Sequence, residues 1–201
     1  MKVQGALMGD LGGIAERAVA AEAIGYDGVF SAEVSHDPFF PLLLAAEHTE
    51  RIELATAIVV AFARNPMTLA NLAHDLNAYS KGRFVLGLGS QIRPHITRRL
   101  SMPWSKPAAR MREFILAMRA VWECWYGGKP LDFRGEFYTH TLMTPMFTPQ
   151  DVAYGAPRVM LAGVGPRMTE VAAEVADGLI AHAFTTRRYF CLLYTSDAAD
   201  E

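Results

Sequence analysis

A glutamate and a histidine follow a predicted strand near the N-terminus. Glu33 and His36 come at the end of the apolar run at 27–33, in the stretch "DGVFSAEVSHDPF". A histidine titrates near neutral pH and can transfer protons, and a nearby carboxylate can orient its ring. We therefore take His36 as a candidate catalytic group and Glu33 as its orienting or proton-handling partner. The alternative is a structural carboxylate beside an ordinary loop histidine.

Two further apolar runs end in glycine-rich turns, "RFVLGLGSQ" at 83–91 and "LAGVGP" at 161–166. Glycine lets a backbone turn sharply or come close to a ligand, so such a turn is either a binding loop or a packing corner. The pattern alone leaves both interpretations open.

The elements that position these residues alternate between two periods. Extended patterns and helical patterns follow one another along the chain, which predicts a parallel sheet with right-handed crossovers in one domain. The expected strands lie at 3–9, 27–33, 51–61, 82–89, 157–166 and 178–184, and the expected helices lie at 12–26, 38–49, 66–79, 105–127 and 167–178. The segment at 127–156 mixes turn residues with aromatic residues and predicts an irregular insertion.

The positions of the candidate residues indicate whether this parallel sheet is open or closed into a barrel. The turn "LMGDLGG" after the first strand lacks the G-x-G-x-x-G pattern of a dinucleotide-binding sheet. A (β/α)8 barrel instead distributes its site over several strand ends, as seen here. A full barrel takes about 250 residues and eight strands. The chain therefore predicts an incomplete α/β barrel of the TIM type, with six of eight strands.

Composition narrows the class of partner. The 201 residues are 51% hydrophobic with a net charge of −2 and contain no basic block, so we expect small-molecule chemistry and no nucleic-acid partner. No apolar run approaches a membrane span, and we expect a cytoplasmic protein without a membrane partner. Cys124, Cys191 and the histidines have no metal-ligand spacing, so no metal site is expected.

Four ordered stretches resemble one known family. They are "EAIGYDGVFSAEVSHDPF", "RIELATAIVVAFARNPMTLA", "SKGRFVLGLGSQ" and "AGVGPRMTEVAAEVADGLI". They are similar to the bacterial luciferase-like monooxygenase family, in particular its deazaflavin-dependent branch, over residues 1–190. The resemblance implies a (β/α)8 barrel with an insertion. Residues 191–201 do not resemble the family, and we expect them to be a foreign or frameshifted tail on a truncated chain.

The resemblance also implies a flavin or deazaflavin at the carboxyl ends of the strands. In the family the third strand often bulges through a non-proline cis peptide behind the ring, which here points to Ala57 and Ile58. The matching turns imply further cofactor contacts: Gly87, Gly89, Ser90 and Gln91 near the ribityl chain, and Gly163, Val164, Gly165 and Pro166 near a phosphate. A second phosphate candidate is the basic loop with Arg93, His95, Arg98 and Arg99, which could equally be a solvated loop.

The implied activity is hydride transfer between the deazaflavin coenzyme F420 and a small organic substrate. The alternatives are an FMN-dependent monooxygenase and a non-catalytic homologue. Many members place histidine directly after the acid, whereas Val34 occupies that position here, and this departure favours the homologue. We expect the full-length parent to form a homo-oligomer. Four aromatic residues could line an apolar pocket or belong to the core, namely Phe39, Phe62, Trp104 and Phe137.

Overall fold

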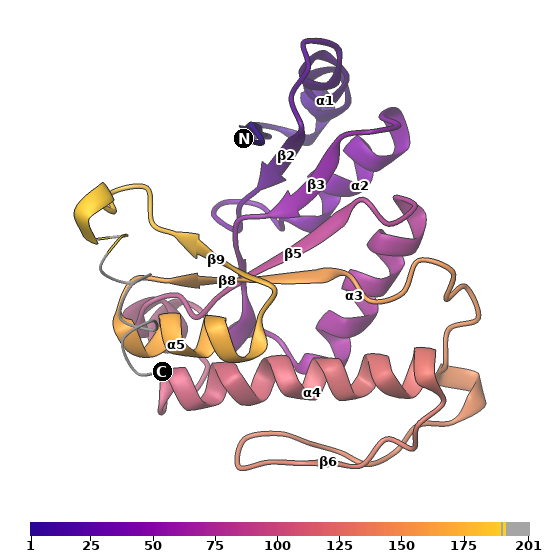
Figure 1. The fold of residues 1–201 in the computed structure, drawn as a ribbon, viewed down its shortest axis with the longest axis vertical. Coiled ribbons are helices and arrows are strands. Elements are labelled where there is room, and N and C mark those ends of the chain that lie inside the picture. Colours follow the sequence, from indigo (N-terminus) through magenta and orange to yellow (C-terminus); the bar gives the residue numbers. More distant parts are fainter. Residues whose placement is uncertain (190, 192–201) are drawn as a thin grey trace.

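A parallel sheet organises the chain in the computed structural model, which describes residues 1–189 and 191. The strands are β1 Gln4–Ala6, β2 Gly28–Ser31, β3 Glu53–Thr56, β5 Phe84–Gly89, β8 Arg158–Gly163 and β9 Gly178–Ala181. Their spatial order is β1-β2-β3-β5-β8-β9, and every pairing is parallel (Figure 1). All six predicted strands are present, in the order that a barrel requires.

A helix follows nearly every strand, as the alternating pattern predicts. Between residues 1 and 181 the α-helices are α1 Ile14–Ala23, α2 Phe39–His48, α3 Pro66–Tyr79, α4 Pro107–Gly127 and α5 Pro166–Val175. Their ends have local causes: the Asn65 side chain caps α3 by accepting the Met67 N–H at 2.9 Å, and Gly128 ends α4 with a φ of 66°. None of the helices described is both long and apolar enough to cross a membrane.

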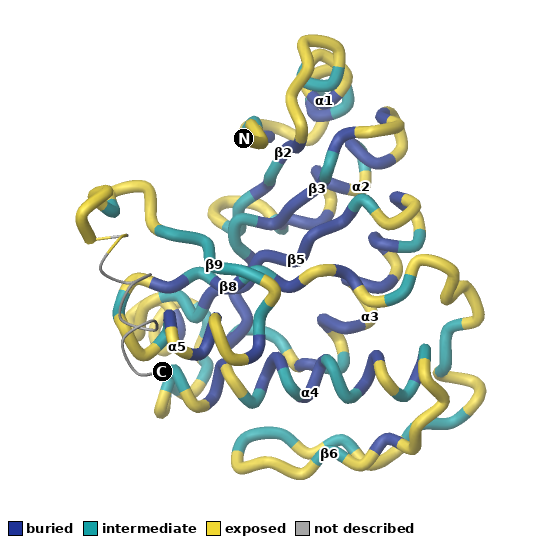
Figure 2. The backbone as a smooth tube through the Cα atoms, in the orientation of Figure 1, coloured by how far each residue is buried: buried dark blue, intermediate teal, exposed yellow. Residues whose placement is uncertain are grey.

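The two faces of the sheet differ in burial. Laterally paired residues share a face, and Leu54, Leu86 and Leu161, which point toward the helices, are completely buried. On the other face, which a barrel would enclose, Phe30 and Ile180 are only half-buried, whereas Ala55 and Val85 in the central strands are buried. Figure 2 shows the buried backbone concentrated in the central strands β3 and β5. The core therefore lies between the sheet and its helices.

The predicted third strand at 51–61 is interrupted. A cis peptide joins Ala57 and Ile58, and the chain continues as the short strand β4 Val59–Val60, which pairs with β5 instead of β2. The cis bond that the resemblance implied is thus present at the implied position. The sixth strand is shorter than predicted, because β9 ends at Ala181.

The predicted irregular insertion contains a small regular unit. An antiparallel hairpin joins β6 Phe133–Arg134 to β7 Thr139–His140, and it runs beside α4 (Figure 1). The Glu113 carboxylate on α4 accepts the N–H groups of Glu136, Phe137 and Tyr138 at 2.9, 2.7 and 2.6 Å. The hairpin is a short regular unit inside the segment predicted to be irregular, and Glu113, which anchors it, lies outside that segment on α4. The predicted foreign tail falls, after Cys191, outside the described residues.

Candidate functional site

The candidate residues gather at the carboxyl ends of β2, β3, β5 and β8. Because these strands are parallel, their last residues share one edge of the sheet. Gly87 and Gly89 lie in β5 with β3 and β4 on one side, and Gly87 pairs with Met160 of β8 on the other. The sheet therefore brings together three of the predicted segments.

Gly87 and Gly89 are required by close packing. A Cβ on Gly87 would lie 1.9 Å from the Thr56 carbonyl oxygen, and a Cβ on Gly89 would lie 2.7 Å from Ile58 Cδ1. Ile58 follows the cis peptide, so the β5 glycines lie directly against the interrupted strand. Together Ile58, Gly87 and Gly89 make a tightly packed junction of backbone and aliphatic atoms, which we call the glycine platform. Both glycines are buried in this junction, and Ile58 is half-buried.

Glu33 has different partners from those expected. Its Oε2 accepts the Val60 N–H at 2.7 Å and a hydrogen bond from Arg64 Nη1, while its own N–H donates to Ile58 O at 3.1 Å. These contacts attach the end of β2 to the interrupted strand. The structure does not give Glu33 a hydrogen bond to His36.

His36 lies in the loop between β2 and α2. Its side chain is exposed, and within the described part of the chain its ring makes no hydrogen bond. An exposed imidazole at the edge of the sheet is free to meet a substrate, whereas Glu33 is held by other groups. The role of His36 in catalysis stays a prediction.

Ser90 and Gln91 continue the chain after β5. Gln91 has a φ of 60°, in the left-handed region, and the Ser90 hydroxyl donates to its carbonyl oxygen at 3.1 Å. The basic loop follows as a π-helical turn at His95–Arg99, with Ile96 buried beneath it. Its four basic side chains are exposed and make no ion pair with a described residue: Arg93, His95, Arg98 and Arg99.

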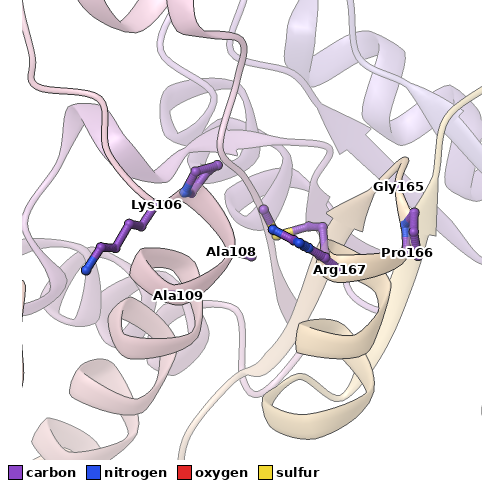
Figure 3. A pocket seen from close by; sticks show the side chains of 8 residues that line it. Lys106, Ala108, Ala109, Gly165, Pro166 and Arg167 are labelled. Atoms are coloured by element: carbon purple, nitrogen blue, oxygen red, sulfur yellow. The ribbon is translucent and has the colours of Figure 1, made fainter.

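Two helix N-termini meet at a pocket of about 740 Å³ on the same side of the sheet. One is the start of α4, at Lys106, Pro107, Ala108 and Ala109, and the other is the start of α5, at Gly165, Pro166, Arg167 and Met168. The Arg167 side chain lies between the two helices, whereas the Lys106 side chain points away from the pocket (Figure 3). Lys106 pairs with Glu136 at 2.7 Å, and Arg167 has no ion pair among the described residues.

We call this space the anion pocket. Some residues of the glycine turn after β8 line it, and others do not. Gly165 caps α5 and Pro166 begins it, so both line the space. Gly163 is buried at the end of β8. Val164 is exposed, and its carbonyl oxygen accepts the Tyr189 hydroxyl at 2.8 Å. Only two of the four predicted residues therefore line the anion pocket.

Arg110 and two aromatic residues support the loop between β5 and α4. The guanidinium of Arg110 lies 4.5 Å from the centre of the Phe62 ring, and it donates to Pro103 O at 2.8 Å and to the Tyr138 hydroxyl at 2.9 Å. Burial raises the pKa of Tyr138, and the effect exceeds the opposing effect of Arg110. Trp104 packs edge-on against Phe62, with ring centres 5.7 Å apart.

The four aromatic residues expected to line a pocket or belong to the core differ in burial. Phe62 is completely buried and Phe39 is 7% exposed, so both belong to the core. Trp104 and Phe137 are half-buried in loops. An apolar pocket lined by all four residues is therefore absent from the described structure. Nor do the described residues contain a group of three or more metal-ligating side chains.

Arg64 and Arg167 were not identified from the sequence. Arg64 immediately precedes the "NP" helix start and follows the third strand, and Arg167 is the second residue of α5. A basic residue next to a helix start at the carboxyl edge of a parallel sheet was the signal available for both.

Comparisons with known proteins identify relatives of this chain. An uncharacterized protein of Mycobacterium tuberculosis (strain H37Rv) is 58% identical over 189 residues, covering 94% of this chain and 56% of the relative. The F420-dependent glucose-6-phosphate dehydrogenase of Intrasporangium calvum is 28% identical over 187 residues, covering 83% of this chain and 52% of that enzyme. The chain thus spans about half the length of these relatives.

The fold is shared with a solved structure. The crystal structure of the monooxygenase RslO1 from Streptomyces bottropensis has a TM-score of 0.81 at 23% identity, covering all of this chain and 66% of that one. The sequence model of the luciferase-like monooxygenases matches residues 2–190, which include every strand and helix described above. The parallel sheet, the interrupted third strand and the glycine turns thus belong to a chain of the luciferase-like monooxygenase family.

Proposed function

We propose that this chain is the nucleotide-binding part of an oxidoreductase that transfers hydride between coenzyme F420 and a small organic substrate. The observation that carries the proposal is the presence, on one edge of the sheet, of the glycine platform and the anion pocket. A deazaflavin has a flat ring, which would lie against the half-buried Ile58 side of the platform, and a phosphate, which the anion pocket would hold.

The anion pocket is lined mainly by apolar atoms, so a phosphate bound there would depend on the backbone N–H groups of two helix starts and on Arg167. Residues in the first turn of a helix have N–H groups without intrahelical acceptors, and the helix dipole favours an anion there. Ala108, Ala109 and Arg167 offer such N–H groups, while Pro107 and Pro166, which lack one, occupy the first position of their helices. The Arg167 guanidinium adds a positive charge between the two helices. This donor set suits a phosphate monoester or diester.

The proton chemistry would fall to His36. When bound, a deazaflavin supplies a ring carbon that gives or takes hydride. A hydride that reaches a carbonyl carbon leaves an oxygen that needs a proton, and the reverse reaction needs a base. His36, exposed at the same edge, can hold that proton on a ring nitrogen. Glu33 would act indirectly, because its carboxylate is bound to Arg64 and the Val60 N–H.

A coenzyme titration tests the proposal. The 201-residue chain is titrated with F420 and with FMN, and fluorescence quenching is followed at low and high salt. We expect saturable F420 binding that weakens about tenfold in Arg167→Gln, because a charge-assisted hydrogen bond contributes about 1.5–3 kcal/mol. The control is Lys129→Gln, beyond the far end of α4, where the lysine is exposed and pairs with Glu123.

Each outcome of the titration favours a different functional class for the protein. Saturable binding of FMN alone would contradict the F420 proposal and favour an FMN-dependent monooxygenase, which needs the same ring surface and phosphate pocket. Binding of neither coenzyme would favour the non-catalytic homologue. If Lys129→Gln weakened binding as much as Arg167→Gln does, the anion pocket would not be the phosphate site.

A further inference from the structure

We infer that Arg64 is a positioning residue that fixes the loop carrying His36 against the glycine platform. The His36 loop comprises residues 33–37, between the end of β2 and the start of α2. The inference rests on the proposed function for its catalytic meaning. The structural part of the inference is that the Arg64 guanidinium fixes the position of this loop, and it rests only on the contacts of Arg64.

Arg64 binds both ends of the His36 loop. Its Nη1 donates to Glu33 Oε2 and its Nη2 donates to Asp37 Oδ2 at 2.9 Å. Glu33 is the first residue of the loop and Asp37 is the last. Val34, Ser35 and His36, which lie between these two anchored residues, are all exposed. The guanidinium therefore closes the base of the loop, and His36 is near its apex.

The same network reaches the interrupted strand. Glu33 Oε2 also accepts the Val60 N–H at 2.7 Å, and the Glu33 N–H donates to Ile58 O at 3.1 Å. Arg64 Nη1 in addition lies 3.4 Å from the Val60 carbonyl oxygen. Since Ile58 contacts Gly89 in the glycine platform, Arg64 links the histidine loop to the surface proposed for the ring.

The start of α2 depends on the same loop. Asp37 uses its second oxygen, Oδ1, to accept the N–H of Phe39, the first residue of α2, at 2.9 Å. Asp37 is thus oriented from both sides, by the helix start and by Arg64. A change in the position of Arg64 would move the loop and the first turn of α2 together.

The geometry requires arginine. A guanidinium is planar and offers donors in a fixed fork, so it can bind two carboxylates in set directions, whereas an ammonium is a single point charge. The side chains of Arg64 and Glu33 are each 15% exposed, so water screens their pair weakly. Lysine at this position would retain the charge and lose the bridge.

Three variants separate positioning from charge balance. Arg64→Lys keeps the charge, and Arg64→Met removes it and leaves two carboxylates unpaired. The triple variant Arg64→Met, Glu33→Gln, Asp37→Asn removes the bridge without leaving an unpaired charge, so it remains informative if Arg64→Met does not fold. Arg51→Met, at an exposed arginine outside the network, is the control.

Hydrogen exchange measured without coenzyme is the first readout. We expect two amides to exchange about tenfold faster or more in Arg64→Lys and in the triple variant, because about 1.5–3 kcal/mol of charge-assisted hydrogen bonding is lost. They are the Glu33 N–H, which donates to Ile58 O, and the Phe39 N–H, which donates to Asp37 Oδ1. The 84–89 amides in β5 should keep their wild-type rates. Wild-type protection of the Glu33 and Phe39 amides in either variant would overturn the inference.

Coenzyme affinity is the second readout. We expect F420 to bind the triple variant less tightly than wild type even where its melting temperature matches, because the platform loses its attachment to the loop. Recovery of wild-type affinity together with wild-type stability would show that Arg64 only balances charge, and would overturn the inference. If wild type binds no coenzyme, the proposed function fails, and the exchange rates still decide whether Arg64 places the loop.

Discussion

Thr56 and Gly87 exchange two hydrogen bonds through one hydroxyl group. Thr56 Oγ1 accepts the Gly87 N–H at 2.8 Å and donates to the Gly87 carbonyl oxygen at 2.9 Å. This occurs at the last residue of β3, immediately before the chain leaves the regular ladder. The hydroxyl satisfies backbone groups of β5 that the interrupted strand does not pair.

Gly87→Ala should destabilise the sheet at this point. Its Cβ would lie 1.9 Å from the Thr56 carbonyl oxygen, and overpacking of a buried site costs about 1–3 kcal/mol. Urea unfolding measures the loss as a lower midpoint. Gly127→Ala is the matched control, since its Cβ would meet open space. Equal midpoints for Gly87→Ala and wild type would contradict this packing.

Arg83→Lys should weaken the junction between α2 and β3. The Arg83 guanidinium donates to the carbonyl oxygens of Ser80, Thr49, Ile52 and Ala46 at 2.8–3.1 Å, and to the Thr49 hydroxyl at 3.0 Å. Lysine has three donors and cannot reproduce this fork. Carbonyls left without partners cost about 1–3 kcal/mol, which chemical denaturation would detect.

The control for this substitution is Arg51→Lys, at an exposed arginine whose side chain has no ion pair in the described structure. It should leave the midpoint unchanged. An Arg83→Lys midpoint as high as that of Arg51→Lys would mean that the charge alone suffices.

Stability should fall in acid partly because of Glu22. Burial raises the pKa of Glu22, but the N–H groups of Arg51, Ile52 and Glu50 lower it more, and the net pKa lies below the usual range. A carboxyl with a lowered folded-state pKa contributes stability above its unfolded pKa of about 4.3, and loses it as pH falls through the folded value. Urea midpoints at pH 7 to 3 should decline less steeply in Glu22→Gln. An unchanged slope would exclude this contribution.

His140 should add a separate pH dependence at milder acidity. Its Nε2 is buried without a hydrogen-bond partner in the described structure, and burial lowers its pKa. The folded state therefore favours the neutral ring, and stability should decrease as pH falls below the unfolded pKa of about 6.5 toward the folded value. His140→Phe should flatten stability between pH 7 and 5.

The control is His95→Gln, at an exposed histidine outside the hairpin, measured at the same pH values. If His140→Phe kept the full wild-type slope, protonation of the buried ring would not contribute.

The sequence pattern predicted the strands and helices well, because hydrophobic periodicity reflects burial directly. It could not predict where the third strand breaks. The residues of "LATAIVVA" are apolar except for Thr56, so periodicity does not mark the change of direction at Ala57 and Ile58. The resemblance to a family supplied that position. The hairpin in the insertion was missed because its strands contain only two residues each.

The candidate site was predicted in part for a related reason. Glycines whose missing side chains permit close approach, such as Gly87 and Gly89, stand out in a sequence. The partner of Glu33 does not, because Arg64 lies 31 residues further along the chain and meets it only after two strands have paired. Spacing in the sequence suggested His36 as the partner of Glu33. In the structure the Glu33 carboxylate binds Arg64 and the Val60 N–H, and it makes no hydrogen bond with His36.

The three hydrogen bonds at Glu113 bear on how this protein can diversify. The carboxylate accepts hydrogen bonds from the main-chain N–H groups at positions 136–138. Every amino acid except proline has such an N–H group. These three hydrogen bonds do not depend on the side chains at 136–138, but they require glycine at 135, where a Cβ would lie 2.1 Å from Glu113 Oε1. Natural variation or directed evolution can therefore change the outward side chains at 136–138, and the tip will remain bound beside α4.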